Sequence, residues 1–249
     1  MLSRLSMRHL VLTVLTSIGL TGPAVAQPPE TWLRCSNEGG RIAPDVIIAA
    51  CSALISSGLE TQDRLAVAYN NRGATYRAKG DHDRAIADHT KAIELNPRFA
   101  EAYSNRGIAH RAKSDNDRAI ADYNKAIEIN PGYALAFNNR GFAYLAKGDY
   151  DRAIADHTKA IEIDPKNVYY YCNRGWDYFK AGKPAQGLPD AEKALQSRPN
   201  DAIILNTRGH IFEALGRRED AIADFRRALA QNPNIQGSRD GLKRLGASP

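Results

Sequence analysis

The sequence predicts an all-α solenoid made of stacked helix–turn–helix units. One pattern of 34 residues is repeated five times between Ala66 and Ile235. Its most similar copies begin at residues 83, 117 and 151 and read DRAIADHTKAIELNP, DRAIADYNKAIEINP and DRAIADHTKAIEIDP. A fixed period of this length is typical of arrays in which each unit packs only on its neighbours. Such arrays present a long concave surface, which favours a protein that holds another molecule.

The composition is that of an ordinary folded protein. Of the 249 residues, 43% are hydrophobic and 25% are charged, and the net charge is +6. Basic and acidic residues alternate within nearly every repeat rather than forming one basic block. We therefore interpret the charge as a solvated surface and expect no nucleic-acid partner.

Residues 1–26 have the pattern of a secretory signal peptide. Arg4 and Arg8 precede the apolar run LVLTVLTSIGL, which is too short to span a bilayer, and Ala24-Val25-Ala26 provides a small-x-small cleavage site. We expect cleavage near Ala26, export to the periplasm or outside the cell, and no membrane span in the mature chain. The loss of Arg4 and Arg8 would lower the net charge to +4.

Residues 27–65 are expected to form an N-terminal cap that contains half a repeat. The stretch DVIIAACSALIS resembles the second helix of the later repeats. Cys35 and Cys51 both lie here, whereas Cys172 lies more than three repeats away, too far for a bridge. In an oxidising compartment the hypothesis is a Cys35–Cys51 disulfide that stabilises the cap. The alternative is two unlinked buried thiols.

The five repeats span 66–99, 100–133, 134–167, 168–201 and 202–235, and each reads as two helices. Counted from the first residue of each repeat, position 4 is large and apolar, position 8 is glycine, position 11 is mostly aromatic, position 27 is alanine and position 32 is proline. Positions 4, 8 and 11 form one stripe of a helix. A Lys-Gly-Asp turn in repeats one and three would end the first helix and cap the second.

These positions identify the array as a member of the tetratricopeptide repeat (TPR) family. Position 24, usually aromatic in that family, is Tyr123 and Phe225 in two repeats and His89, His157 and Ala191 in the others. The resemblance implies a right-handed superhelix whose first helices line a groove for a peptide or protein. After the array, residues 236–249 are expected to provide a capping helix and a tail.

Two charged positions are invariant among the five copies, arginine at position 7 and aspartate at position 23. The hypothesis is a ladder of structural ion pairs, bidentate where geometry permits. The alternative is two unrelated solvated rows. The expected pairs are Arg72–Asp88, Arg106–Asp122, Arg140–Asp156, Arg174–Asp190 and Arg208–Asp224.

The family geometry places positions 2, 5, 9, 12 and 13 on the concave side, which also assigns His210 to the groove. Aromatic and apolar groove residues concentrate in repeats three and four, and such residue types dominate binding interfaces. The alternative is that some pack as core. We expect the partner-binding residues to be Leu135, Asn138, Phe142, Tyr169, Trp176 and Phe179.

No catalytic, nucleotide-binding or metal motif occurs in the sequence, so we expect no enzyme and no cofactor. Histidines at positions 11 and 24 are interpreted as packed substitutes for aromatic residues rather than metal ligands. The predicted function is a protein–protein interaction module, and the alternative is a structural or assembly protein acting by self-association or through its outer face. In repeat four, Pro189 is expected to weaken or kink the second helix.

Overall fold

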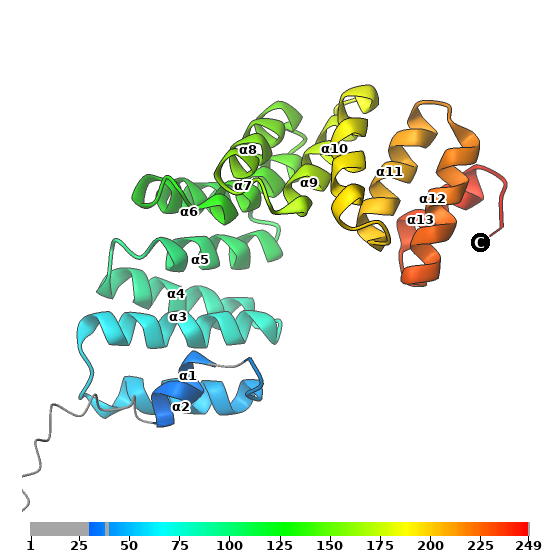
Figure 1. Cartoon of the computed structure of the whole chain (residues 1–249). Helices are drawn as coiled ribbons and strands as arrows, with labels where there is room; N and C mark the ends of the chain where they lie inside the picture. The colour runs from blue at the N-terminus through cyan, green and yellow to red at the C-terminus, as the bar shows by residue number, and fades with distance from the viewer. Residues whose placement is uncertain (1–29, 38–39, 249) are drawn as a thin grey trace, which may run out of the picture.

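The computed structural model describes residues 30–37 and 40–248, and within these ranges the chain is helical without strands. The predicted signal peptide lies outside the described residues. The fold is the all-α solenoid that the sequence predicts (Figure 1). The helices are α1 (Glu30–Ser36), α2 (Pro44–Ser57), α3 (Gln62–Ala78), α4 (His82–Leu95), α5 (Ala100–Ala112), α6 (Asn116–Ile129), α7 (Ala134–Ala146), α8 (Tyr150–Ile163), α9 (Val168–Lys180), α10 (Pro184–Ser197), α11 (Ala202–Ala214), α12 (Arg218–Gln231) and α13 (Gln236–Arg244).

The turn inside each repeat follows from its sequence. In repeat one, Gly80 has φ 82°, a left-handed conformation that glycine adopts without strain, and it ends α3. Asp81 then caps α4 by accepting a hydrogen bond from the backbone N–H of Arg84 at 3.1 Å. Repeat two keeps this turn with Ser114 at φ 64°, where a side chain is disfavoured.

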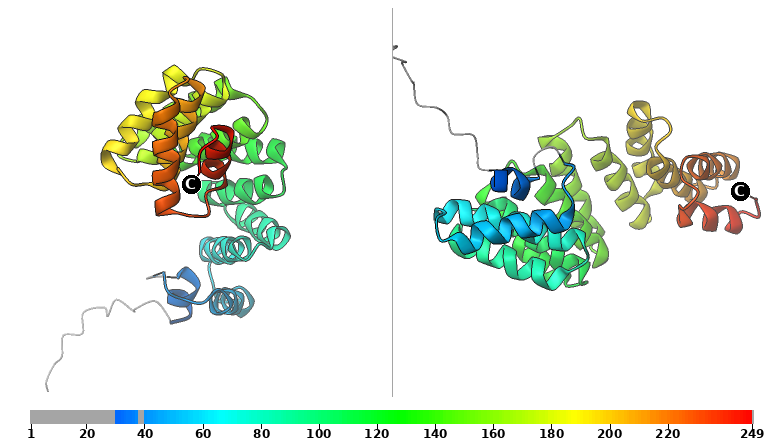
Figure 2. Two further views of the ribbon diagram at one scale, coloured as in Figure 1. Left: turned by 90° about the vertical axis from the view of Figure 1, so that its right-hand side faces the viewer. Right: turned by 90° about the horizontal axis from the view of Figure 1, so that it is seen from below.

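The first helices of the repeats line the inner side of the array. Within the described chain, α3 packs on α5, α5 on α7, α9 on α11 and α11 on α13, whereas second helices pack only on first helices. Neighbouring first helices are therefore closer than neighbouring second helices, which bends the stack. The views in Figures 1 and 2 show the resulting arc, with α1–α5 at one end and α9–α13 at the other.

Glycine at position 8 makes room for the ring at position 24 of the same repeat. A Cβ at Gly73 would lie 2.9 Å from Cε1 of His89, and one at Gly107 would lie 2.7 Å from Cε1 of Tyr123. Both rings are fully buried. The invariant glycine is thus a packing requirement, because any side chain would displace the ring.

In repeat four, the two helices pack against each other without a ring at position 24. Ala191 replaces the ring, and the two helices approach until a Cβ at Gly187 would lie 2.5 Å from the carbonyl oxygen of Gly175. Pro189 lies inside α10, which runs from Pro184 to Ser197, so the proline does not end the helix. A Cβ at Gly175 would meet Gly187 before the proline and Asp190 and Ala191 after it, so α9 lies close to α10 on both sides of Pro189.

The N-terminal cap consists of two helices. Short α1 packs on α2 and α3, and a disulfide joins Cys35 to Cys51 with their Cα atoms 4.8 Å apart. The side chains of Trp32, Ile47 and Leu54 are buried in one cluster with this bridge. The cap therefore contains a shortened first helix as well as the half repeat that the sequence suggests.

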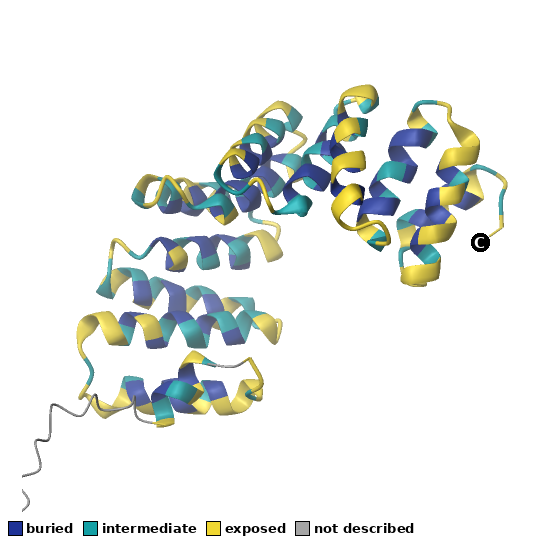
Figure 3. Ribbon diagram, in the orientation of Figure 1, coloured by how far each residue is buried: buried dark blue, intermediate teal, exposed yellow. Residues whose placement is uncertain are grey.

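At the other end, α13 covers the open side of the last repeat. Leu242 is buried against Phe212 and Phe225. Figure 3 shows the same pattern along the whole array, with buried residues where helices face one another and exposed residues at the helix tips.

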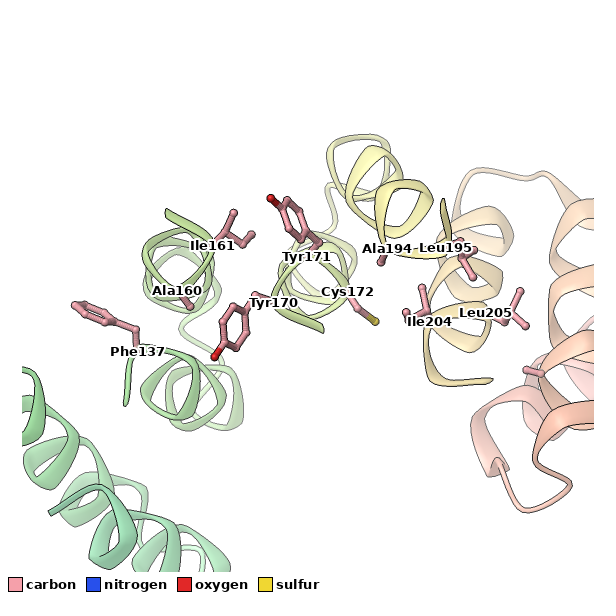
Figure 4. Close-up of a cluster of buried hydrophobic side chains, with 11 residues drawn as sticks. Phe137, Ala160, Ile161, Tyr170, Tyr171, Cys172, Ala194, Leu195, Ile204 and Leu205 are labelled. Atoms are coloured by element: carbon pink, nitrogen blue, oxygen red, sulfur yellow. The ribbon is translucent and has the colours of Figure 1, made fainter. Parts of the chain in front are cut away.

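The largest group of buried side chains joins repeats three, four and five. It includes Phe137, Tyr170, Tyr171, Ile204 and Leu205. Figure 4 shows Tyr170 projecting from α9 toward repeat three, while the Cys172 sulfur points toward Ile204. This core fixes the relative position of the three first helices that form the candidate site. No described helix is long and apolar enough to cross a membrane.

Candidate functional site

A pocket of about 550 Å³ opens on the concave side between α7, α9 and α11. It contains five of the six residues predicted to bind a partner, and Cys172, Ile203 and Asn206 of its lining also stand at predicted groove positions. Its lining consists of Leu135, Asn138 and Phe142 from α7, Asn167 before α9, Tyr169, Tyr170, Cys172, Asn173 and Trp176 from α9, and Ile203, Asn206 and Thr207 from α11.

The pocket forms where the spacing of the first helices changes. Position 3 is a fully buried alanine in repeats one to three but Tyr170 in repeat four. Of the neighbouring first helices, α7 and α9 have the sparsest backbone contact. A tyrosine in place of alanine holds the two helices apart, and the aromatic residues of α9 line the space that results.

Phe179, the sixth predicted residue, lies beside the pocket rather than in its lining. Its ring centroid is 5.0 Å from that of Trp176 and 5.7 Å from that of His210. His210 in turn meets Phe225 edge-on at 5.0 Å. Phe179 therefore packs against Trp176, which lines the pocket.

The prediction that His210 lies open in the groove is wrong. Its side chain is buried, and α13 covers it, with the Arg244 guanidinium 3.3 Å from Nδ1. Burial, followed by the charge of Arg244, lowers the pKa of His210. Arg244 also forms a bidentate ion pair with Glu213, so this end of the groove is closed.

Hydrogen bonds between first helices fix the polar part of the lining. Asn173 donates to Asn138 at 2.8 Å, and the thiol of Cys172 donates to the Thr207 hydroxyl at 3.4 Å. At the rim, Tyr169 donates to Asp201 at 2.7 Å, and this bond raises the pKa of the Tyr169 hydroxyl. These contacts orient side chains that the sequence alone does not place.

A buried hydrogen bond between a histidine and an aspartate lies next to Phe142 of the pocket lining. Nδ1 of His157 is 2.5 Å from a carboxylate oxygen of Asp177, and neither side chain is exposed to solvent. The Phe142 ring packs edge-on against His157 at 5.3 Å. Burial raises the pKa of Asp177, and its hydrogen bond to His157 opposes that shift. This pair is not among the sequence-based predictions, although Asp177 is the one acid at a position that is otherwise Thr75, Ala109, Ala143 or Ile211.

Each arginine of the proposed ladder contacts its aspartate through two hydrogen bonds. The Nε and Nη2 atoms donate to the two carboxylate oxygens, at 2.8 Å each for Arg72 and Asp88. The same arrangement joins Arg106–Asp122, Arg140–Asp156, Arg174–Asp190 and Arg208–Asp224, with distances between 2.6 and 3.0 Å.

The ladder also joins neighbouring repeats. Nη1 of Arg106 donates to Thr90 of the preceding repeat at 3.1 Å, and Nη1 of Arg72 donates to Ser52 of the cap at 2.8 Å. One arginine thus contacts two successive second helices. Its planar group suits this role because its donors point in several fixed directions.

No group of three metal-ligating side chains occurs within residues 30–37 and 40–248. His89 is buried without a hydrogen-bond partner, and burial followed by Arg77 and Arg106 lowers its pKa to about 3. A neutral imidazole of this kind fills core space, as the sequence suggests.

Models of the tetratricopeptide repeat match residues 66–99, 134–167 and 172–234, and a TPR repeat model matches residues 109–148. Together they cover more than half of the chain. The chain is a tetratricopeptide repeat protein. TPR proteins are protein-interaction modules, and none of the matching models describes a catalytic family.

Solved structures show the same TPR fold. A TPR protein from Parabacteroides merdae is 22% identical with a TM-score of 0.65, covering 89% of this chain and 86% of that one. YrrB, described as a TPR protein with an unusual peptide-binding site, is 20% identical with a TM-score of 0.59, covering 78% and 98%. Pseudomonas aeruginosa pilF is 21% identical with a TM-score of 0.66, covering 74% and 84%. Among curated protein sequences, none matches this TPR chain.

Proposed function

We propose that the protein is a non-enzymatic binding module that holds an extended segment of another protein in the groove of its first helices. The pocket between α7, α9 and α11 carries the proposal. Its volume of about 550 Å³ is in the usual range for ligand sites. Its walls are the aromatic side chains of Phe142, Tyr169 and Trp176, a residue class that dominates binding energy at interfaces.

The pocket chemistry suits one protruding side chain and the peptide backbone beside it. The aromatic walls favour an apolar or aromatic side chain. Carboxamides of Asn138, Asn173 and Asn206 carry both donors and acceptors, which are the functions of a peptide group. YrrB supports the proposal to the extent that a protein of the same fold is described as having a peptide-binding site.

A displayed library of random 12-residue peptides, selected on residues 27–249, tests the proposal. Peptides that bind the unaltered protein are then titrated against Trp176→Ala. We expect affinity to fall at least tenfold, because truncation of a central aromatic residue typically costs more than 1 kcal/mol. Circular dichroism of both proteins checks that the helices remain.

A matched pair of milder variants isolates the pocket. Leu135→Ala removes a half-exposed side chain from the pocket, whereas Val67→Ala removes one at the same position of repeat one, outside the pocket. We expect only Leu135→Ala to weaken binding. Equal affinities of all three variants and the unaltered protein would contradict the proposed site.

We further propose that this module is exported. The signal-like residues 1–26 and the Cys35–Cys51 disulfide support this, because disulfides persist mainly in oxidising compartments. Expression of the full chain in a Gram-negative host should yield periplasmic protein that begins at Gln27. Cytoplasmic protein that retains residues 1–26 would contradict export.

A further inference from the structure

Two arginines in the groove have no acidic partner among the described residues. Arg77 and Arg111 occupy position 12 of repeats one and two, near the ends of α3 and α5, and neither takes part in an ion pair with a described residue. By contrast, Arg72 and Arg106 on the same helices are held by Asp88 and Asp122. The unpaired arginines therefore keep their charge available to a ligand.

These two charges act on one buried hydroxyl. Burial raises the pKa of Tyr123 to about 12, and the nearby Arg111 and Arg77 oppose that shift. Tyr123 is fully buried and its hydroxyl has no hydrogen-bond partner, and neither has the buried Nε of Arg77. Unused donors and positive charge thus meet on the groove side of repeats one and two.

The positive region is continuous with the aromatic pocket. The Arg111 guanidinium lies 5.7 Å from the ring centroid of Phe142, which lines the pocket. The groove acid on the same helix, Glu101, stands ten residues earlier, about 15 Å along the axis. At the far end of the groove, Arg244 neutralises Glu213. Positive charge without an acidic partner therefore remains at Arg77 and Arg111 in repeats one and two, and at Lys180 in repeat four.

From this arrangement we infer the chemistry of the partner, an inference that rests on the proposed function. The groove takes an extended acidic segment of another protein, with an aromatic or large apolar residue in the pocket and carboxylates on Arg111 and Arg77. Adjacent packed helices are about 8–10 Å apart and an extended chain advances about 3.3 Å per residue, so each helix corresponds to roughly three residues. The pocket is centred on α9, which places the carboxylates about six and nine residues from the anchor.

Synthetic peptides with this spacing test the inference. The probe is a fluorescent 12-residue peptide with tryptophan at residue 2, glutamate at residues 8 and 11 and serine or glycine elsewhere, together with the peptide of reversed order. In each control peptide, glutamine replaces both glutamates. We expect the better glutamate peptide to bind at least tenfold more tightly than its glutamine control, since charge-assisted hydrogen bonds are roughly twice as strong as neutral ones.

Variants of the protein assign the effect to the groove. Arg111→Gln and Arg77→Gln should each reduce the preference for glutamate. Arg98→Gln, the same charge change at an exposed arginine in the turn after α4, should leave it intact. Rising salt should weaken the glutamate peptides and spare the glutamine ones.

The possible failures are distinguishable. Equal binding of glutamate and glutamine peptides, both lost in Trp176→Ala, would overturn the acidic partner and leave the proposed binding function standing. Absence of binding by every peptide would overturn the anchor and spacing, while the library selection decides the function independently. Tighter binding of a 12-nucleotide oligothymidylate, lost in Arg111→Gln, would overturn the inference in favour of a nucleic acid.

Discussion

Repeats one and three have almost the same second helix but different environments for its histidine. Helices α4 and α8 differ only at their first and last residues. His89 is buried without a hydrogen-bond partner, whereas His157 is paired with Asp177. The difference comes from the next repeat, where Asp177 occupies the position that is Ala109 after repeat one. Nearly identical helices in this solenoid can therefore have different electrostatic environments, because the next repeat supplies part of each environment.

Of the changes that test this comparison, breaking the pair of His157 and Asp177 should lower the free energy of unfolding most. His157→Phe would leave the Asp177 carboxylate buried without its partner, and we expect a loss of about 3–5 kcal/mol in the free energy of unfolding at pH 7. Urea unfolding followed by circular dichroism measures this. His89→Phe should lower the free energy of unfolding far less, because His89 has no acidic partner that would be left buried and unpaired.

The chain offers a control for the buried pair in repeats two and three. There, Tyr123 and Ala143 occupy the positions of His157 and Asp177. The double variant His157→Tyr/Asp177→Ala recreates that apolar arrangement and should come within about 1 kcal/mol of the unaltered protein. If the double variant is as unstable as His157→Phe, loss of the charge pair is not the cause.

His89 should make repeat one sensitive to acid. Its pKa is about 3 in the folded chain and about 6.5 when unfolded. Between these values only the unfolded chain binds the proton, so its contribution to stability is complete above pH 6.5 and falls on acidification. From pH 6.5 to 4.5 the loss is roughly 2 kcal/mol. His89→Tyr should flatten this part of the urea-unfolding profile, and parallel profiles for both proteins would refute the assignment.

Removing an aspartate of the arginine ladder should destabilise repeats one and three to nearly the same extent. Asp88→Ala and Asp156→Ala each leave one half-buried guanidinium without its two charge-assisted hydrogen bonds, at a cost of about 2 kcal/mol. Asp156 also raises the pKa of Asp177, so its removal should cost slightly less. Thermal unfolding of both variants at pH 7 checks this, and a larger loss for Asp156→Ala would contradict it.

The smallest expected change concerns the turn of repeat two, which lies between the compared repeats. Ser114 has φ 64° where repeats one and three have Gly80 and Gly148. Ser114→Gly should therefore stabilise the protein by about 0.5–1 kcal/mol, the left-handed strain being larger than the entropy lost with glycine. Gly148→Ser is the reverse experiment, and it should lower the unfolding midpoint by a similar amount.

Local periodicity predicted most of the fold because each repeat carries its own signals. Glycine at position 8, the aromatic positions and the aspartate caps all act within one repeat, so they can be recognised along the chain. The family resemblance, rather than the period alone, assigned Leu135, Phe142, Tyr169 and Trp176 to the concave side, and the structure places all four in the lining of one pocket.

Contacts between repeats were harder to predict. His157 and Asp177 are 20 residues apart in different units, and the covering of His210 depends on α13, which belongs to no repeat. An acid at an otherwise small or apolar position was the available signal for Asp177. The separation of α7 from α9 likewise depends on Tyr170, whose size matters only once its neighbour is known.

The stacked first helices also set the distance between the positive region and the aromatic pocket. Because each repeat contacts only its neighbours, a further copy of repeat three inserted before Ala134 would keep both the positive region and the aromatic pocket while moving them about one helix spacing apart. A partner would then need about three more residues between its anchor and its carboxylates. In the proposed binding mode, the number of repeats, rather than any single side chain, sets the length of the segment that the groove can hold.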